Sequence, residues 1–170
     1  MVNLLTKPFA HIMVALCLLF WSETSFAQVR KFGLGVIIGE PTGISAKLWT
    51  SNSNALDFGL GWSFVDNRYY GGSRVHLHVD YLWHAWNAIE SSESLPLYYG
   101  VGGRFTGWEN SWNNQYYDSR GSLALRGVFG IAWLPRETLI DVFLEIAPSL
   151  RLTPSSGFAL DAALGARYYF

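Results

Sequence analysis

The chain has 170 residues, of which 50% are hydrophobic, 16% are aromatic and only 15% are charged. Its 12 Lys and Arg against 13 Asp and Glu give a formal net charge of −1. This balance has no basic surplus to attract nucleic acid, so a nucleic-acid partner is not expected.

Residues 1–27 have the features of a secretory signal peptide. Lys7 precedes an apolar run over residues 12–21 that is too short to span a bilayer, and Ser25-Phe26-Ala27 fits a small-x-small cleavage site. We therefore expect export, cleavage near Ala27, and one mature domain of residues 28–170.

Eight later segments alternate apolar residues with small or polar ones, which is the period of a β-strand. Turn-forming residues such as Glu40-Pro41 and Thr153-Pro154 separate them. In chain order the predicted strands are 32–39, 43–50, 55–64, 74–83, 96–107, 122–134, 139–152 and 158–170. Pro148 interrupts the seventh and predicts a bulge or the emergence of that strand from a membrane. The fourth connection has room for a helical turn over 85–90.

The two faces of these segments differ in a way that distinguishes barrel types. In 55–64, Leu56, Phe58 and Leu60 share one face, while Asp57 and Gly59 lie on the other. A soluble barrel fills its interior with bulky apolar side chains, whereas here the bulky face is nearly free of charge and the other face carries charges and glycines. The pattern predicts an all-β, eight-stranded, antiparallel, up-and-down transmembrane β-barrel. The alternative is a periplasmic sandwich with its apolar faces packed inward.

The predicted inward face carries charges of both signs. Its members are Lys47, Asp57, Arg74, Asp80, Arg104, Arg126, Asp141, Glu145, Arg151, Asp161 and Arg167. Unpaired charge in a narrow lumen is costly, so a neutralising network is expected. We interpret this network as a structural plug, because an eight-stranded barrel is only just wide enough for its own side chains. A narrow channel is the alternative.

The mature chain resembles the small OmpA/OmpX-type eight-stranded outer-membrane barrels. Its last segment, 158–170, ends in Phe170 and resembles their closing strand, which serves as an assembly signal. Residues 33–49, GLGVIIGEPTGISAKLW, resemble more narrowly a group of largely uncharacterised bacterial surface barrels with a GEPTG-type first turn; one spirochaetal relative is linked to binding host proteins. The resemblance implies a bacterial outer-membrane location, contact with outer-membrane lipid and lipopolysaccharide, and recognition of the C-terminal strand by the barrel assembly machinery. It transfers no catalytic or ligand-binding residues.

The connection after the fifth segment is the predicted recognition element. It reads WENSWNNQYYDSRG and sets Trp108, Trp112, Tyr116 and Tyr117 among amides and hydroxyls. Such side chains suit a sugar, lipopolysaccharide or the surface of a host protein. The alternative is that the aromatic residues belong to the interfacial girdle of a membrane barrel.

An enzyme is the less favoured interpretation. Some eight-stranded outer-membrane barrels modify lipid A, and Ser73, His76, His78 and Asp80 lie close together in this sequence. However, no GxSxG-type nucleophile motif is present, and two histidines alone are a weak metal signal. The only cysteine, Cys17, lies in the predicted signal peptide. We expect no catalytic residue, no metal and no cofactor.

Overall fold

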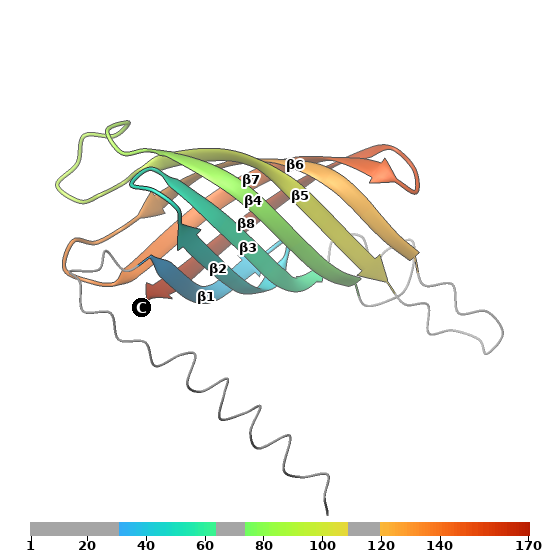
Figure 1. The fold of residues 1–170 in the computed structure, drawn as a ribbon, viewed down its shortest axis with the longest axis horizontal. Helices are drawn as coiled ribbons and strands as arrows, with labels where there is room; N and C mark the ends of the chain where they lie inside the picture. The colour runs from blue at the N-terminus through green and yellow to red at the C-terminus, as the bar shows by residue number, and fades with distance from the viewer. Residues whose placement is uncertain (1–30, 64–73, 109–119) are drawn as a thin grey trace, which may run out of the picture.

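The computed structural model describes residues 31–63, 74–108 and 120–170, and these form a closed barrel of eight antiparallel strands (Figure 1). The strands are β1 (Phe32–Gly39), β2 (Thr42–Trp49), β3 (Asn54–Ser63), β4 (Arg74–Ala85), β5 (Leu97–Trp108), β6 (Arg120–Trp133), β7 (Ile140–Thr153) and β8 (Gly157–Tyr169). Each strand pairs with the next one along the chain, and β8 pairs with β1 to close the barrel. The predicted all-β, up-and-down, eight-stranded fold is confirmed.

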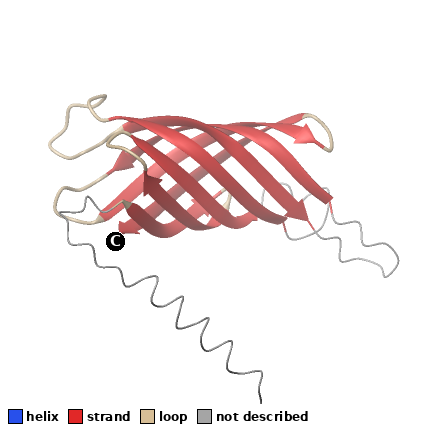
Figure 2. Cartoon of the chain, viewed as in Figure 1, coloured by secondary structure: helices blue, strands red, loops and turns tan. Residues whose placement is uncertain are grey.

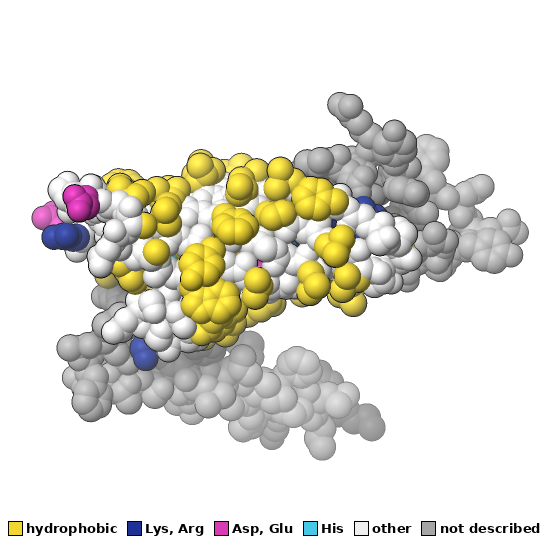
Figure 3. Space-filling view, turned by 90° about the horizontal axis from the view of Figure 1, so that it is seen from above, with side chains coloured by type: hydrophobic (Ala, Val, Ile, Leu, Met, Phe, Trp, Pro, Cys, Tyr) yellow, Lys and Arg dark blue, Asp and Glu magenta, His cyan; other side chains and the backbone are white. Residues whose placement is uncertain are grey.

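Side chains alternate strictly between the wall and the interior. In β8, Asp161, Gly165 and Arg167 are buried, whereas Leu160 and Leu164, at the alternate positions, are exposed. Apolar side chains consequently cover the outer wall, and charged ones appear toward its ends (Figure 3). Burial is thus largely the reverse of that in a soluble barrel, because most charged residues of the strands are inside and most large apolar ones outside.

Inward-facing glycines make room for larger inward side chains on the neighbouring strand. A Cβ built on Gly59 would overlap the His78 ring, and a Cβ built on Gly165 would overlap the Phe143 ring. Gly130 has the same relation to Tyr98. The small residues of the inward face are therefore part of the packing of a narrow interior.

Two local expectations are corrected. The segment over 85–90 holds no helix: Ala85 ends β4, and the connection that follows makes turns and bends before Ser94 pairs with Leu134 (Figure 2). Pro148 lies inside β7 opposite Leu160 and marks no bulge, so that alternative is wrong; the emergence of β7 from a membrane at this residue stays a prediction. The register irregularity instead lies nearer the end of β7, where the β6–β7 pairing shifts between Leu123 and Ala124. No helix in the described part of the chain is long and apolar enough to cross a membrane.

The hairpin of β1 and β2 is the shortest part of the wall, with eight residues in each strand. β1 pairs with residues 163–169 of β8, so the first half of β8 rises beyond the hairpin, and Figure 1 shows this end of the barrel stepped. The Glu40 N–H donates to the Ala162 carbonyl at 2.9 Å, which anchors the turn against β8.

The interior packing predicts a contrast between two glycines. Replacing Gly165 with Val should destabilise the barrel by about 1–3 kcal/mol, because the new side chain competes with the Phe143 ring for one space. Gly103→Val is the matched control, since the nearest atom to a Cβ there is 4.0 Å away. Urea unfolding in detergent micelles, followed by tryptophan fluorescence, measures both. Equal stability of the two variants would show that Gly165 is not needed for space.

Candidate functional site: the charged interior

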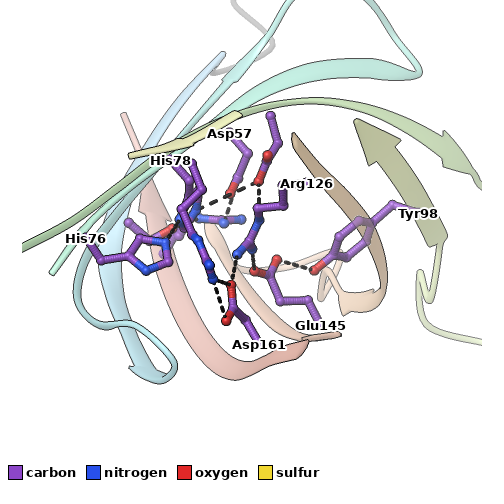
Figure 4. Close-up of polar contacts among 11 residues, drawn as sticks. Asp57, His76, His78, Tyr98, Arg126, Glu145 and Asp161 are labelled. Atoms are coloured by element: carbon purple, nitrogen blue, oxygen red, sulfur yellow. Dashed lines mark hydrogen bonds and ion pairs between the residues drawn. The ribbon is translucent and has the colours of Figure 1, made fainter. Parts of the chain in front are cut away.

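Arg126 is the centre of the interior network, and only 2% of its surface is exposed. It projects from β6 and contacts carboxylates from three other strands (Figure 4). Its Nε donates to Asp80 Oδ2 at 3.0 Å, its Nη2 to Glu145 Oε1 at 2.6 Å and its Nη1 to Asp161 Oδ2 at 3.2 Å. All three guanidinium nitrogens are thus engaged in charge-assisted hydrogen bonds, each with a different carboxylate.

Two neighbours extend the cluster around Arg126. The Arg104 Nη1 donates to both oxygens of Asp161, at 2.9 and 2.7 Å, and links β5 to β8. The Tyr98 hydroxyl donates to Glu145 Oε2 at 3.2 Å. Asp161 therefore sits between two arginines and Glu145 between an arginine and a phenol, so these buried carboxylates have the partners that their burial requires.

A second cluster surrounds Arg167. Its Nη2 lies 2.6 Å from Asp57 Oδ1, its Nη1 donates to Asp141 Oδ2 at 3.4 Å and its Nε to Ser45 Oγ at 2.9 Å. The guanidinium also stacks 3.8 Å from the centre of the Phe143 ring. Asp141 in addition accepts a hydrogen bond from the Tyr169 hydroxyl at 2.8 Å.

Lys47 lies next to this second cluster. Its Nζ is 3.7 Å from Asp141 Oδ2 and 3.3 Å from His84 Nε2. The rings of Trp49 and Tyr98 lie 5.4 and 5.1 Å from the same ammonium group, within the range of cation–π contacts. A buried lysine is thus held by one carboxylate, one imidazole and two aromatic faces.

The two clusters meet where Asp57 and Asp80 lie directly opposite each other on β3 and β4. Like charges in this relation repel. A different arginine compensates each negative charge, since Asp57 contacts Arg167 and Asp80 contacts Arg126. Each carboxylate of this pair therefore has its own cation.

The structure groups most of the predicted network residues inside the barrel. Lys47, Asp57, Asp80, Arg126, Asp141, Glu145, Asp161 and Arg167 are all buried, and Arg104 is partly buried. Arg151 is different: it is half-exposed near the end of β7 and makes no ion pair with a described residue. The side chain of Arg74 lies outside the described residues, as do Ser73, Trp112, Tyr116, Tyr117 and the side chain of Trp108.

Four polar members of the network were not predicted from the sequence: Ser45, His84, Tyr98 and Tyr169. Alternation places Ser45, Tyr98 and Tyr169 on the inward face, so the signal was present. Their hydrogen bonds depend on how far each side chain extends across the lumen, and the alternation of residues along a strand does not predict this distance. His84 was placed in the fourth connection because the predicted strand ended at residue 83, whereas β4 continues to Ala85.

Two histidines of β4, His76 and His78, contact each other. His76 Nε2 and His78 Nδ1 are 3.1 Å apart, and His78 Nε2 lies 3.9 Å from Asp80 Oδ2, beyond a hydrogen bond (Figure 4). No histidine contacts a serine hydroxyl among the described side chains. No group of three or more His, Cys, Asp or Glu in the described ranges is arranged to hold a metal ion.

Together the strand order, the buried charges and the apolar outer wall define a closed eight-stranded β-barrel with an ion-paired interior. No protein-family model matches the chain, and no curated protein sequence matches it significantly. Among solved structures, the chain is similar to the N-terminal β-barrel domain of Pseudomonas aeruginosa OprF. The TM-score is 0.62 at 12% identity, and the match covers 83% of this chain and 98% of that one. At this identity the likeness shows a shared fold.

The network predicts a large effect of removing its centre. Arg126→Met should destabilise the barrel by about 3–5 kcal/mol, because Asp80 and Glu145 lose their buried cation. Arg136→Met, at an exposed position in the β6–β7 connection, is the control and should stay within about 0.5 kcal/mol. Urea titration of both variants in micelles measures the difference. A stability equal to wild type in Arg126→Met would contradict the importance of these pairs.

Proposed function

We propose that the chain is a small bacterial outer-membrane β-barrel protein with a structural or surface-binding role. The observation that carries this proposal is the inverted burial of the barrel. Leu60, Leu125, Leu144 and Leu164 face outward, each at least half exposed, while the charged side chains are inside. In water such a wall would be an aggregation hazard, whereas in a bilayer it is the surface that lipid requires. Closure of the sheet supports the same conclusion, because an open edge has no partner in hydrocarbon.

Strand length and the signal-like N-terminal sequence agree with this location. Strands β4 to β8 have 12 to 14 residues, enough to span the hydrocarbon core when tilted. We propose that residues 1–27 direct export and are cleaved near Ala27. On this proposal, the wall contacts outer-membrane lipid and lipopolysaccharide, and the C-terminal strand is recognised by the assembly machinery. We also propose that the chain belongs with the bacterial surface barrels that have a GEPTG-type first turn.

We further propose that the interior is a plug. Arg126 on β6 reaches Asp80 on β4 and Asp161 on β8, and Arg167 on β8 reaches Asp57 on β3. These pairs join strands that are not neighbours in the sheet, so they cross the lumen. An ion passing through would have to separate desolvated pairs.

Any binding activity is then proposed for exposed connections, with Trp108, Trp112, Tyr116 and Tyr117 as the candidate contacts for a host or surface protein or a glycan. The proposal includes no catalysis.

Membrane insertion predicts a strong effect of charge on the wall. Leu60→Arg should reduce the stability of the inserted barrel by about 2–4 kcal/mol, because Leu60 lies within β3 on the outer face. Ser53→Arg, in the exposed β2–β3 turn, is the control and should insert normally. Membrane fractionation and heat-modifiable gel mobility measure insertion. Recovery of wild-type protein in the soluble periplasmic fraction would refute the outer-membrane assignment.

The plug predicts the electrical behaviour of the purified barrel. Wild-type protein in planar bilayers should show no large, steady conductance, because paired side chains cross the lumen. A large-pore porin measured in the same bilayers provides the positive control. Reproducible porin-scale channels from the wild-type chain would refute the plug and favour the channel alternative.

A further inference from the structure

A cavity of about 550 Å³ opens at the end of the barrel that carries the start of β1 and the end of β8. We call it the terminal cup; Lys31, Trp49, Trp86, Leu134, Ile140 and Tyr169 are among the residues that line it. Its size lies within the roughly 300–1,000 Å³ of small-ligand sites. The charged interior begins behind its floor, where Tyr169 bonds Asp141 and Trp49 covers Lys47.

The aromatic wall of the cup is held in place before any ligand arrives. The rings of Trp49 and Trp86 stack with their centres 5.6 Å apart and an interplanar angle of 28°. The Trp86 Nε1–H donates to the Asn52 carbonyl at 2.9 Å, which ties the β4–β5 connection to the β2–β3 turn. Trp86 keeps about a third of its surface exposed. A preorganised indole face is thus available for an apolar group at little ordering cost.

The charge of the cup is one-sided. Lys31 is the only ionised side chain among the described residues that line the cavity, and no carboxylate lines it. The rest of the lining is mostly apolar and includes Leu134, Leu139 and Ile140 beside the two indoles. This combination is complementary to a molecule with an apolar body and one negative charge.

We propose that the terminal cup binds a single-chain amphiphile with a carboxylate head, its chain against Trp86 and the aliphatic wall and its head toward Lys31. The proposal concerns this cavity alone and does not depend on where the barrel resides. It differs from the predicted recognition site around Trp112, which belongs to a different connection.

The test uses the mature chain in phosphatidylcholine nanodiscs with ¹⁵N-labelled tryptophan. Octanoate is the probe, and octylammonium is its matched opposite, with the same chain length and the reverse charge. We expect octanoate to shift the indole signals of Trp49 and Trp86 in a saturable manner, and octylammonium to bind more weakly, because Lys31 repels its head group. Lys31→Gln should weaken octanoate binding about three- to fivefold, the range of an exposed ion pair.

Two further variants complete the design. Trp86→Leu removes the exposed indole face and should weaken octanoate binding, read from the Trp49 signal. Arg136→Gln changes an exposed charge at the same end but outside the lining and should leave the affinity unchanged. Circular dichroism verifies that each variant keeps its sheet.

Four outcomes would overturn the proposal. One is equal, unsaturable shifts with both probes, which would indicate partition into the nanodisc. Another is unchanged octanoate affinity in Lys31→Gln. The third is a saturable response to octyl glucoside as strong as that to octanoate, which would identify a site for neutral or sugar-headed ligands. The last is no shift of either indole at octanoate concentrations that remain below micelle formation.

Discussion

A charged side chain buried inside a narrow barrel needs an oppositely charged partner within that interior. Arg126 meets this requirement with three carboxylates. Its three nitrogens reach carboxylates on the neighbouring strand β7 and on β4 and β8, which the sheet does not pair with β6. Removing two charges from water costs several kcal/mol each, and only close, multiple contacts compensate that cost. The arrangement of the interior follows from this requirement. Asp57 and Asp80 lie opposite each other on β3 and β4 and would repel. Arg167 compensates the charge of Asp57, and Arg126 compensates that of Asp80.

The same constraint explains the composition of the inward face. Long charged side chains can cross the lumen only where the neighbouring inward position leaves space, and glycine, which has no side chain, provides that space. Asp80 lies over Gly102 on its way to Arg126, and His78 lies over Gly59. The outer wall has the opposite need. There, bulky Leu, Val and Phe residues present an apolar surface, so the strands mostly alternate small or polar inward residues with large apolar outward ones.

The charged interior and the terminal cup are adjacent and share residues such as Tyr169. Lys47 contacts Asp141 on one side and the Trp49 and Tyr98 rings on the other, and Tyr169 bonds Asp141 while lining the cup. An aromatic layer therefore lies between the ion-paired interior and a cavity that carries one positive charge. This layer lets a polar network end close to solvent without exposing its buried groups, since the rings supply both apolar cover and a favourable face for the ammonium.

Period-2 alternation in the sequence by itself determined the strands, their number and the face on which each residue lies, because successive side chains of a strand must point to opposite sides. It therefore placed Lys47, Arg126 and Asp161 on one common face. The partners were decided only by tertiary structure. The curved sheet brings inward side chains of β4, β6 and β8 within reach of one another, and alternation does not indicate that Arg126 pairs with Asp80, 46 positions away. The roles of Tyr98 and His84 were decided in the same way, because a hydrogen bond across a lumen depends on side-chain length and on which distant strand lies opposite. The terminal cup also exists only in the folded chain, since its wall joins the ends of strands far apart in sequence.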